Sequence, residues 1–114
     1  KYTPPLGWAA VAKFESCGRD WDTLFFNTAR WRRLSKLSGC VAPADSRSFA
    51  AGVFQSTSDP ALVLTVVGAH YPQTLNASTH AYEDAVGNLS ASIANLYTPR
   101  AVLLADTNTE GPAA

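Results

Sequence analysis

The chain has few of the residues that build disulfide scaffolds or metal clusters. Its 114 residues include no methionine, two cysteines and two histidines. One bridge between Cys17 and Cys40 is possible but is not required by the sequence, because two cysteines do not define a disulfide framework. Neither cysteine has a zinc-type spacing to a histidine. The composition therefore excludes a cysteine-rich scaffold and a zinc-finger domain.

The chain also lacks net charge and long apolar runs. Nine basic and nine acidic side chains cancel, so no global field draws the chain to nucleic acid or to an anionic membrane. No apolar run approaches the roughly 18 residues of a membrane span, and the first residues lack a signal-peptide core. We expect a soluble, monomeric segment with no membrane span, in which any contact with a polyanion is local.

Several sequence motifs are missing as well. The chain has no glycine-rich phosphate loop and no Gly-x-Ser-x-Gly elbow, which disfavours nucleotide triphosphate hydrolysis and serine-hydrolase chemistry. It has no repeat and no linker, so we expect one domain or part of one. The lack of methionine, even at position 1, indicates a piece of a longer protein.

Two glycosylation sequons give the only hint of a compartment. They are Asn76-Ala77-Ser78 and Asn88-Leu89-Ser90, and each matches the acceptor pattern for N-glycosylation. They predict a secreted or extracellular glycoprotein.

Short apolar runs predict strands in the first half of the chain. These are Trp8–Phe14, Thr23–Asn27 and Phe49–Gln55. We expect a basic turn at 29–36, where Arg30, Arg32, Arg33 and Lys36 surround Trp31 and could grip a nucleic-acid backbone. The residues at 39–48 are rich in turn formers and predict a loop.

The second half predicts a strand, a helix and a strand. Asp59-Pro60 makes a turn into Ala61–Ala69, a uniformly apolar run that is typical of a strand buried on both faces. A helix follows between Thr79 and Tyr97, and Ala101–Leu104 is a second apolar strand. This order indicates an α/β sheet covered by helices.

The helix is predicted from its amphipathic pattern. Its apolar face carries Tyr82, Val86, Leu89, Ile93 and Leu96, and its polar face carries Asp84, Asn88, Ser92 and Asn95. Ser78 or Thr79 can cap its start, and Pro99 stops it. The sequon at Asn88 should therefore be accessible.

Polar side chains follow both apolar strands. His70 comes directly after the first, and Asp106 and Asn108 follow the second. If the two strands are parallel neighbours, these groups meet at one edge of the sheet. Asp106 and Asn108 then offer oxygen ligands to a hard cation such as Mg²⁺, and His70 can donate a proton. The alternative is that all three are ordinary turn residues.

This order of elements resembles the endonuclease/exonuclease/phosphatase superfamily, most closely its deoxyribonuclease I-like branch. The letters at 105–108, Ala-Asp-Thr-Asn, correspond to that family's GDFN motif. The segment from Arg47 to Phe54 is similar to the branch's R-x-P-A-x-x-x-F. The resemblance implies a mixed sheet with a covering helix, as part of a two-sheet α/β sandwich.

The resemblance also implies roles for individual residues. His70 would protonate the leaving oxygen, and Asp106 and Asn108 would hold the phosphate and a divalent cation, Mg²⁺ or else Ca²⁺ or Mn²⁺. Arg47 would clamp a phosphate oxygen. Asp22 is the best match for the acid that orients His70, and Glu15 is the alternative, whereas for Arg47 a solvated loop arginine remains the other interpretation.

The resemblance is incomplete in ways that bear on activity. Ala105 and Thr107 replace the family's glycine and phenylalanine, and neither the N-terminal metal-binding glutamate motif nor the C-terminal Asp-x-His pair has a match. The chain would be the central fragment of the domain or a degenerate relative. We expect metal-dependent cleavage of DNA, with a sphingomyelinase, an inositol-phosphate phosphatase and a non-catalytic binding module as alternatives.

Overall fold

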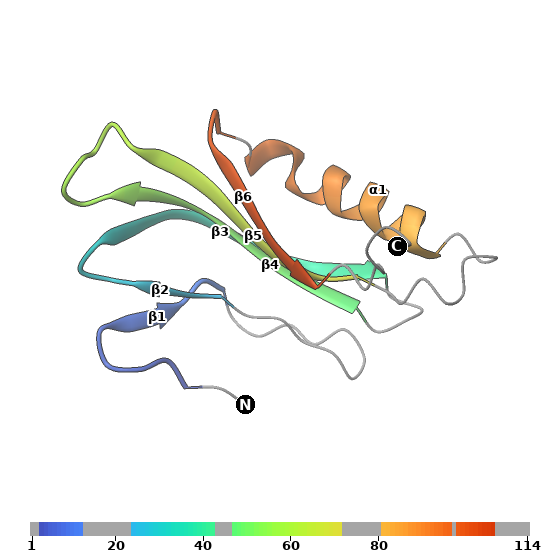
Figure 1. Cartoon of the computed structure of the whole chain (residues 1–114), viewed down its shortest axis with the longest axis horizontal. Helices are drawn as coiled ribbons and strands as arrows, with labels where there is room; N and C mark the ends of the chain where they lie inside the picture. Colours follow the sequence, from blue (N-terminus) through green and yellow to red (C-terminus); the bar gives the residue numbers. More distant parts are fainter. Residues whose placement is uncertain (1–2, 13–23, 43–46, 72–80, 97, 107–114) are drawn as a thin grey trace, which may run out of the picture.

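A computed structural model describes residues 3–12, 24–42, 47–71, 81–96 and 98–106. At 41–42, 81–85 and 106 it describes the backbone alone. The described elements form three layers (Figure 1). A helix lies on one face of a four-stranded sheet, and a two-stranded sheet lies on the other face.

The four-stranded sheet has the order β3 (Trp31–Ala42), β4 (Arg47–Ser56), β5 (Val63–His70) and β6 (Ala101–Asp106). β3, β4 and β5 are antiparallel neighbours, whereas β5 and β6 are parallel. A parallel pair needs a crossover connection, and the chain between β5 and β6 contains the helix. The prediction of a mixed sheet with a covering helix is confirmed.

The crossover contains α1 (Ala81–Ile93) and the short 3₁₀ helix η3 (Ala94–Leu96). Leu89 and Ile93 of α1 are buried in a core cluster that covers β4 and β5. The cluster's other members are Phe49, Ala51, Val67, Ala69 and Tyr71. The predicted helix is therefore present, and Asn88 is exposed on it, as the amphipathic pattern indicated. Val86, which the pattern assigned to the apolar face, is exposed.

The opposite face of the sheet packs against β1 (Trp8–Ala10) and β2 (Phe25–Asn27). The rings of Phe26 and Phe54 lie 5.1 Å apart. Nη1 of Arg33 donates to the carbonyl oxygens of Ala10 and Val11, at 3.1 and 2.7 Å, which fastens the end of β1 to β3. This contact explains why an arginine in the middle of the basic segment faces the protein.

The basic segment is strand from Trp31 onward, so the predicted turn at 29–36 is wrong for 31–36. The turn lies at 28–30, where the side-chain Oδ1 of Asn27 accepts a hydrogen bond from the amide of Ala29 at 3.0 Å. Trp31 already pairs with Ser56. The physical reason is that β3 is an edge strand, and edge strands tolerate charged side chains.

The predicted loop at 39–48 is mostly strand. β3 continues through Ala42 and β4 begins at Arg47, and Cys40 pairs with Ser48. Inter-strand pairing thus overrides the local turn preference of these residues. The predicted turn at Asp59 is confirmed, because the amide of Leu62 donates to the carbonyl oxygen of Asp59 at 2.8 Å.

β6 differs from its prediction in burial. We expected a buried strand, but Ala101–Ala105 are all exposed. β6 is the last strand of the sheet and has a neighbour on one side only within the described residues. The apolar side chains of β6 are thus not covered by other residues of the described part of the chain. Among the described residues, no helix is long and apolar enough to cross a membrane.

Candidate functional site

The ends of β5 and β6 lie side by side. The two strands are parallel, and their register pairs His70 with Asp106. Each strand is an apolar run, and the intervening helix lets the chain return to start the second strand in the same direction. His70 and Asp106, two predicted site residues that are distant in the sequence, therefore lie side by side at the same end of the sheet.

Arg47 lies at the same end of the sheet, because β4 runs antiparallel to β5 and begins where β5 ends. Phe49 pairs with Ala69, so the start of β4 lies next to the end of β5, and the same register continued sets Arg47 opposite Tyr71, one residue beyond His70. Nη1 of Arg47 lies 3.1 Å from Nδ1 and 3.2 Å from Nε2 of His70. Both side chains are half-buried. The structure thus brings Arg47 and His70 into direct contact, which the sequence did not predict.

The two nearly equal distances describe how the guanidinium meets the imidazole ring. In the plane of the ring, a position equally far from both nitrogens would collide with Cε1. Nη1 therefore lies over the ring. A guanidinium can only donate, and a ring nitrogen accepts only when it carries no proton.

Arg47 retains donors that the described residues do not use. Its Nε is buried and has no hydrogen-bond partner among them. Buried polar groups are usually hydrogen-bonded, and a planar guanidinium matches the geometry of phosphate oxygens. An anion bound between Arg47 and His70 would satisfy this requirement.

The residues that follow Arg47 and His70 in the sequence are held in the protein interior. Ser48 and Tyr71, directly after Arg47 and His70 in the sequence, are both buried. Tyr71 belongs to the core under α1, and Cys40, the β3 partner of Ser48, is disulfide-bonded. Sequence reasoning singled out neither Ser48 nor Tyr71, although their positions next to Arg47 and His70 were a signal. They anchor the strand ends that carry the pair.

Several predicted site residues lie outside the described residues. These are Asp22, its alternative Glu15, and Asn108. Cys17 also lies outside them. Their predicted roles stay predictions, and for Asp106 only the position in β6 is described.

The described residues do not form a complete cation site. No group of three or more His, Cys, Asp or Glu side chains among them could hold a metal ion. His70 is in contact with a guanidinium, and that positive charge favours an anion over a cation. Asp106 and Asn108 remain the predicted ligands of Mg²⁺.

The basic segment lies at the other end of the sheet from His70. Arg32 pairs with Gln55 near the end of β4, whereas Arg47 begins that strand. At about 3.3 Å a residue this separates the two ends by roughly 26 Å. The basic segment and His70 therefore cannot contact the same phosphate group.

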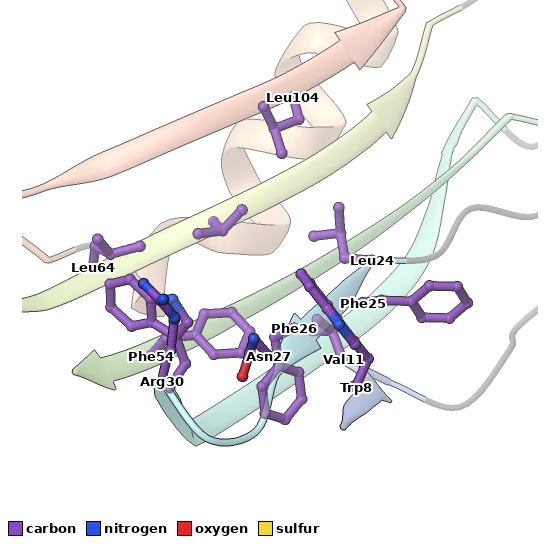
Figure 2. Close-up of a pocket in the computed structure, with 12 residues that line it drawn as sticks. Trp8, Val11, Leu24, Phe25, Phe26, Asn27, Arg30, Phe54, Leu64 and Leu104 are labelled. Carbon is purple, nitrogen blue, oxygen red and sulfur yellow. The ribbon is translucent and has the colours of Figure 1, made fainter. Parts of the chain in front are cut away.

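An apolar groove of about 540 Å³ lies between the two sheets (Figure 2). Its lining includes Trp8, Phe26, Phe54, Leu64, Val66 and Leu104, with Asn27 and Arg30 as polar members. Among the described residues that line it there is no histidine and no carboxylate. The groove therefore offers apolar contact and is separate from the Arg47–His70 pair.

Comparisons with known proteins support the fold. No family model matches the sequence, and no curated protein is significantly similar to it. Solved structures do match. The catalytic domain of human Nocturnin with a bound sulfate anion has a TM-score of 0.67 and 15% sequence identity, over 92% of this chain and 44% of that one.

Two proteins of Bacteroides thetaiotaomicron are also similar. A mannosyl-6-phosphatase matches with a TM-score of 0.68 and 14% identity, over 93% of this chain and 45% of that one. An endonuclease/exonuclease/phosphatase family protein matches with a TM-score of 0.65 and 15% identity, over 90% and 42%. The chain spans less than half the length of these structures. At such identities the likeness concerns the fold alone, and over the part it spans the chain has the α/β fold that these three structures share.

Proposed function

We propose that the chain forms part of a phosphoesterase. The phosphate would bind at the end of the sheet where Arg47, His70 and Asp106 lie. The observation that carries the proposal is the contact of Arg47 Nη1 with both ring nitrogens of His70. It occurs next to the strand position that pairs His70 with Asp106. A fold shared with a mannosyl-6-phosphatase supports the same reaction class.

The pair suggests a division of work during hydrolysis. Arg47 binds a phosphate oxygen with donors that include the buried Nε, and its charge opposes the negative charge that develops on the oxygens. His70 holds a proton and gives it to the leaving oxygen as water adds to phosphorus and the P–O bond breaks.

DNA is the substrate that we propose. The support is the likeness of the segment Arg47–Phe54 to the deoxyribonuclease I-like branch. A phosphodiester of a phospholipid or an inositol phosphate is the alternative within the same reaction class. The match to a sugar phosphatase favours testing phosphomonoesters as well.

A divalent cation belongs to this proposal. Asp106 and Asn108 would hold Mg²⁺, or Ca²⁺ or Mn²⁺ in its place, since hard cations prefer oxygen ligands. The bound cation would stabilise charge on the phosphate. Because the described residues contain no complete group of ligands, a non-catalytic module that binds phosphate through Arg47 is a second candidate function.

We also propose a secreted, oxidising location. Cys40 is disulfide-bonded, and disulfides persist mainly outside the reducing cytosol. Asn88 of the second sequon is exposed on α1. Treatment of the natively expressed protein with a glycosidase would lower its mass if this location is correct.

Phosphate binding at the pair can be tested directly by NMR. We expect titration with inorganic phosphate, and then with a short single-stranded DNA, to shift the ring resonances of His70 and the Nε resonance of Arg47. His80 is the only other histidine and serves as an internal control. Resonances of His70 that do not move at millimolar phosphate would contradict the proposal. Plasmid nicking with Mg²⁺ then separates a nuclease from a module that only binds.

A further inference from the structure

Basic side chains gather at the end of the sheet that lies away from His70. This end consists of the β2–β3 and β4–β5 turns, the first half of β3 and the residue before β6, opposite to the arrowhead of β6 in Figure 1. It holds one of the nine acidic residues of the chain, Asp59, and five of its nine basic residues. These five are Arg30, Arg32, Arg33, Lys36 and Arg100. The chain has no net charge, yet this end of the sheet is strongly positive.

Strand pairing places Arg32 and Arg100 almost level with each other on the two outer strands. Arg32 pairs with Gln55, and Gln55 pairs with Val63. The amide of Thr65, two residues further along β5, donates to the carbonyl oxygen of Arg100 at 2.9 Å. Three inter-strand spacings of about 4.8 Å separate β3 from β6, which is roughly 14 Å. The positive charges therefore extend over the whole width of this end.

Four of the five basic side chains are available to a partner. Arg33 is the exception, because its Nη1 donates to carbonyl oxygens of the β1 segment. The other four, Arg30, Arg32, Lys36 and Arg100, are exposed. Within the described part of the chain, no ion pair or side-chain hydrogen bond is found for them. Basic side chains are almost never fully buried unless they are paired. Any further protein segment that covers the apolar faces of the sheet would therefore leave these charges in contact with solvent.

Lys36 lies part of the way from this end to the phosphate site. It pairs with Gly52, five residues from Arg47 along β4, which is roughly 16 Å. Arg32 is roughly 26 Å from Arg47 by the same measure. The exposed basic residues of β3 thus follow one direction, from the basic end of the sheet toward Arg47.

We propose that this basic end, defined by Arg30, Arg32, Lys36 and Arg100, binds the phosphate backbone of DNA at a second place. The inference rests on the proposed function, in which a DNA phosphate binds between Arg47 and His70. DNA fits both places because its phosphates repeat at about 3.4 Å along each strand, so a duplex of roughly 8 base pairs spans the distance of about 26 Å. A single phosphate group or a lipid headgroup cannot span it. The second contact would give the enzyme a preference for polymeric DNA over small phosphodiesters.

The length of the DNA provides the first test, with the protein at its natural length. A hairpin of about 5 base pairs spans roughly 17 Å and reaches one place, whereas a duplex of about 16 base pairs spans roughly 54 Å and reaches both. We expect the double variant Arg30→Ala with Arg32→Ala to lower the ratio of duplex affinity to hairpin affinity about tenfold. Fluorescence anisotropy in EDTA, which prevents cleavage, measures both affinities. Circular dichroism establishes that the variant is folded.

Salt dependence provides the second test. The logarithm of the binding constant falls with the logarithm of the salt concentration by about 0.9 for each phosphate contact, so the slope for the duplex should be smaller by about 1.8 in the double variant. Ser92→Asp with Asn95→Asp makes the same change in net charge on the exposed face of the helical crossover. This control should keep the wild-type slope. Asp59→Asn, which removes the acidic residue of the basic end, should strengthen duplex binding.

The outcomes separate this inference from the proposed function. A duplex affinity that the double variant leaves unchanged would overturn the second contact, as would an equal loss in the Ser92→Asp and Asn95→Asp control. Binding of polyglutamate as tight as that of the duplex would overturn it in favour of an acidic protein partner. Hydrolysis of a small chromogenic phosphodiester by the unmodified protein with Mg²⁺ tests the proposed function alone. Its absence would contradict catalysis while leaving the duplex measurements to be judged on their own.

Discussion

Nη1 of Arg47 lies 3.1 Å from Nδ1 of His70, although the two residues are 23 positions apart in the chain. The antiparallel pairing of β4 and β5 brings the start of one strand next to the end of the other, and the two side chains reach each other there although the register sets Arg47 opposite Tyr71. Because β5 also pairs in parallel with β6, position 106 lies next to His70 at the same end of the sheet. Three predicted site positions thus come from the ends of three adjacent strands.

Replacing Arg47 should weaken phosphate binding. We expect Arg47→Lys to lose about tenfold in affinity, because an ammonium cannot reproduce the planar donors of a guanidinium. Arg47→Ala should lose more. Isothermal titration with phosphate or a short DNA measures both. Arg32→Ala, at the far end of the sheet, is the matched control, and an equal loss in that variant would place the binding site elsewhere.

Replacing His70 should lower turnover more than binding. We expect His70→Ala to reduce the rate of phosphodiester hydrolysis about 10²–10⁴-fold, which is the usual contribution of a positioned acid or base. The side chain is half-buried, so the thermal midpoint should change little. If the variant keeps the wild-type rate while remaining folded, His70 is not the proton donor.

Removing the divalent cation should abolish activity and leave the fold. We expect EDTA to stop plasmid nicking, and Asp106→Asn to weaken Mg²⁺ binding because one ligand charge is lost. Titration calorimetry with MgCl₂ follows binding without relying on activity. Asp59→Asn, in the turn between β4 and β5, is the control. Unchanged Mg²⁺ affinity in Asp106→Asn would remove Asp106 from the ligand set.

Gly68 lies where Leu24, the residue before β2, packs closely against the four-stranded sheet. A Cβ at this position would lie 2.8 Å from a side-chain carbon of Leu24. We expect Gly68→Ala to destabilise the protein by about 1–3 kcal/mol, as overpacking does. Gly87→Ala on α1 is the matched control, because a Cβ there meets nothing within 4 Å. That variant should stabilise the helix by about 0.5–1 kcal/mol. Urea denaturation compares the two.

Thr65 ties the end of the crossover to β5. Its side chain is fully buried, and Oγ1 donates to the carbonyl oxygen of Leu96. We expect Thr65→Val to cost about 1–3 kcal/mol, because the carbonyl oxygen of Leu96 loses its donor in a part-buried contact. Ser92→Ala removes a comparable bond, from Oγ to the carbonyl oxygen of Asn88, on the exposed face of α1. A stability change within about 0.5 kcal/mol is expected there, and equal costs would contradict the role given to burial.

Local patterns in the sequence were enough to predict several elements. Helical spacing of apolar residues predicted α1, uniform apolar runs predicted β5 and β6, and Asp59-Pro60 predicted the turn before β5. Each of these signals depends on residues that are close in the chain. The strand, helix and strand order also led to the expected α/β fold, which the similar solved structures share.

Other features depend on residues that are distant in the chain. Pairing with β4 makes a strand of the basic segment, in place of the predicted turn, and moves it away from His70. Within the described residues β6 has a neighbour on one side only, and its apolar side chains are exposed. The contact of Arg47 with His70 likewise depends on two strands that are distant in the chain lying side by side. Register and strand order are set by non-local pairing, and for that reason the composition of each segment could suggest a strand but not which neighbour would cover it or which charges would meet.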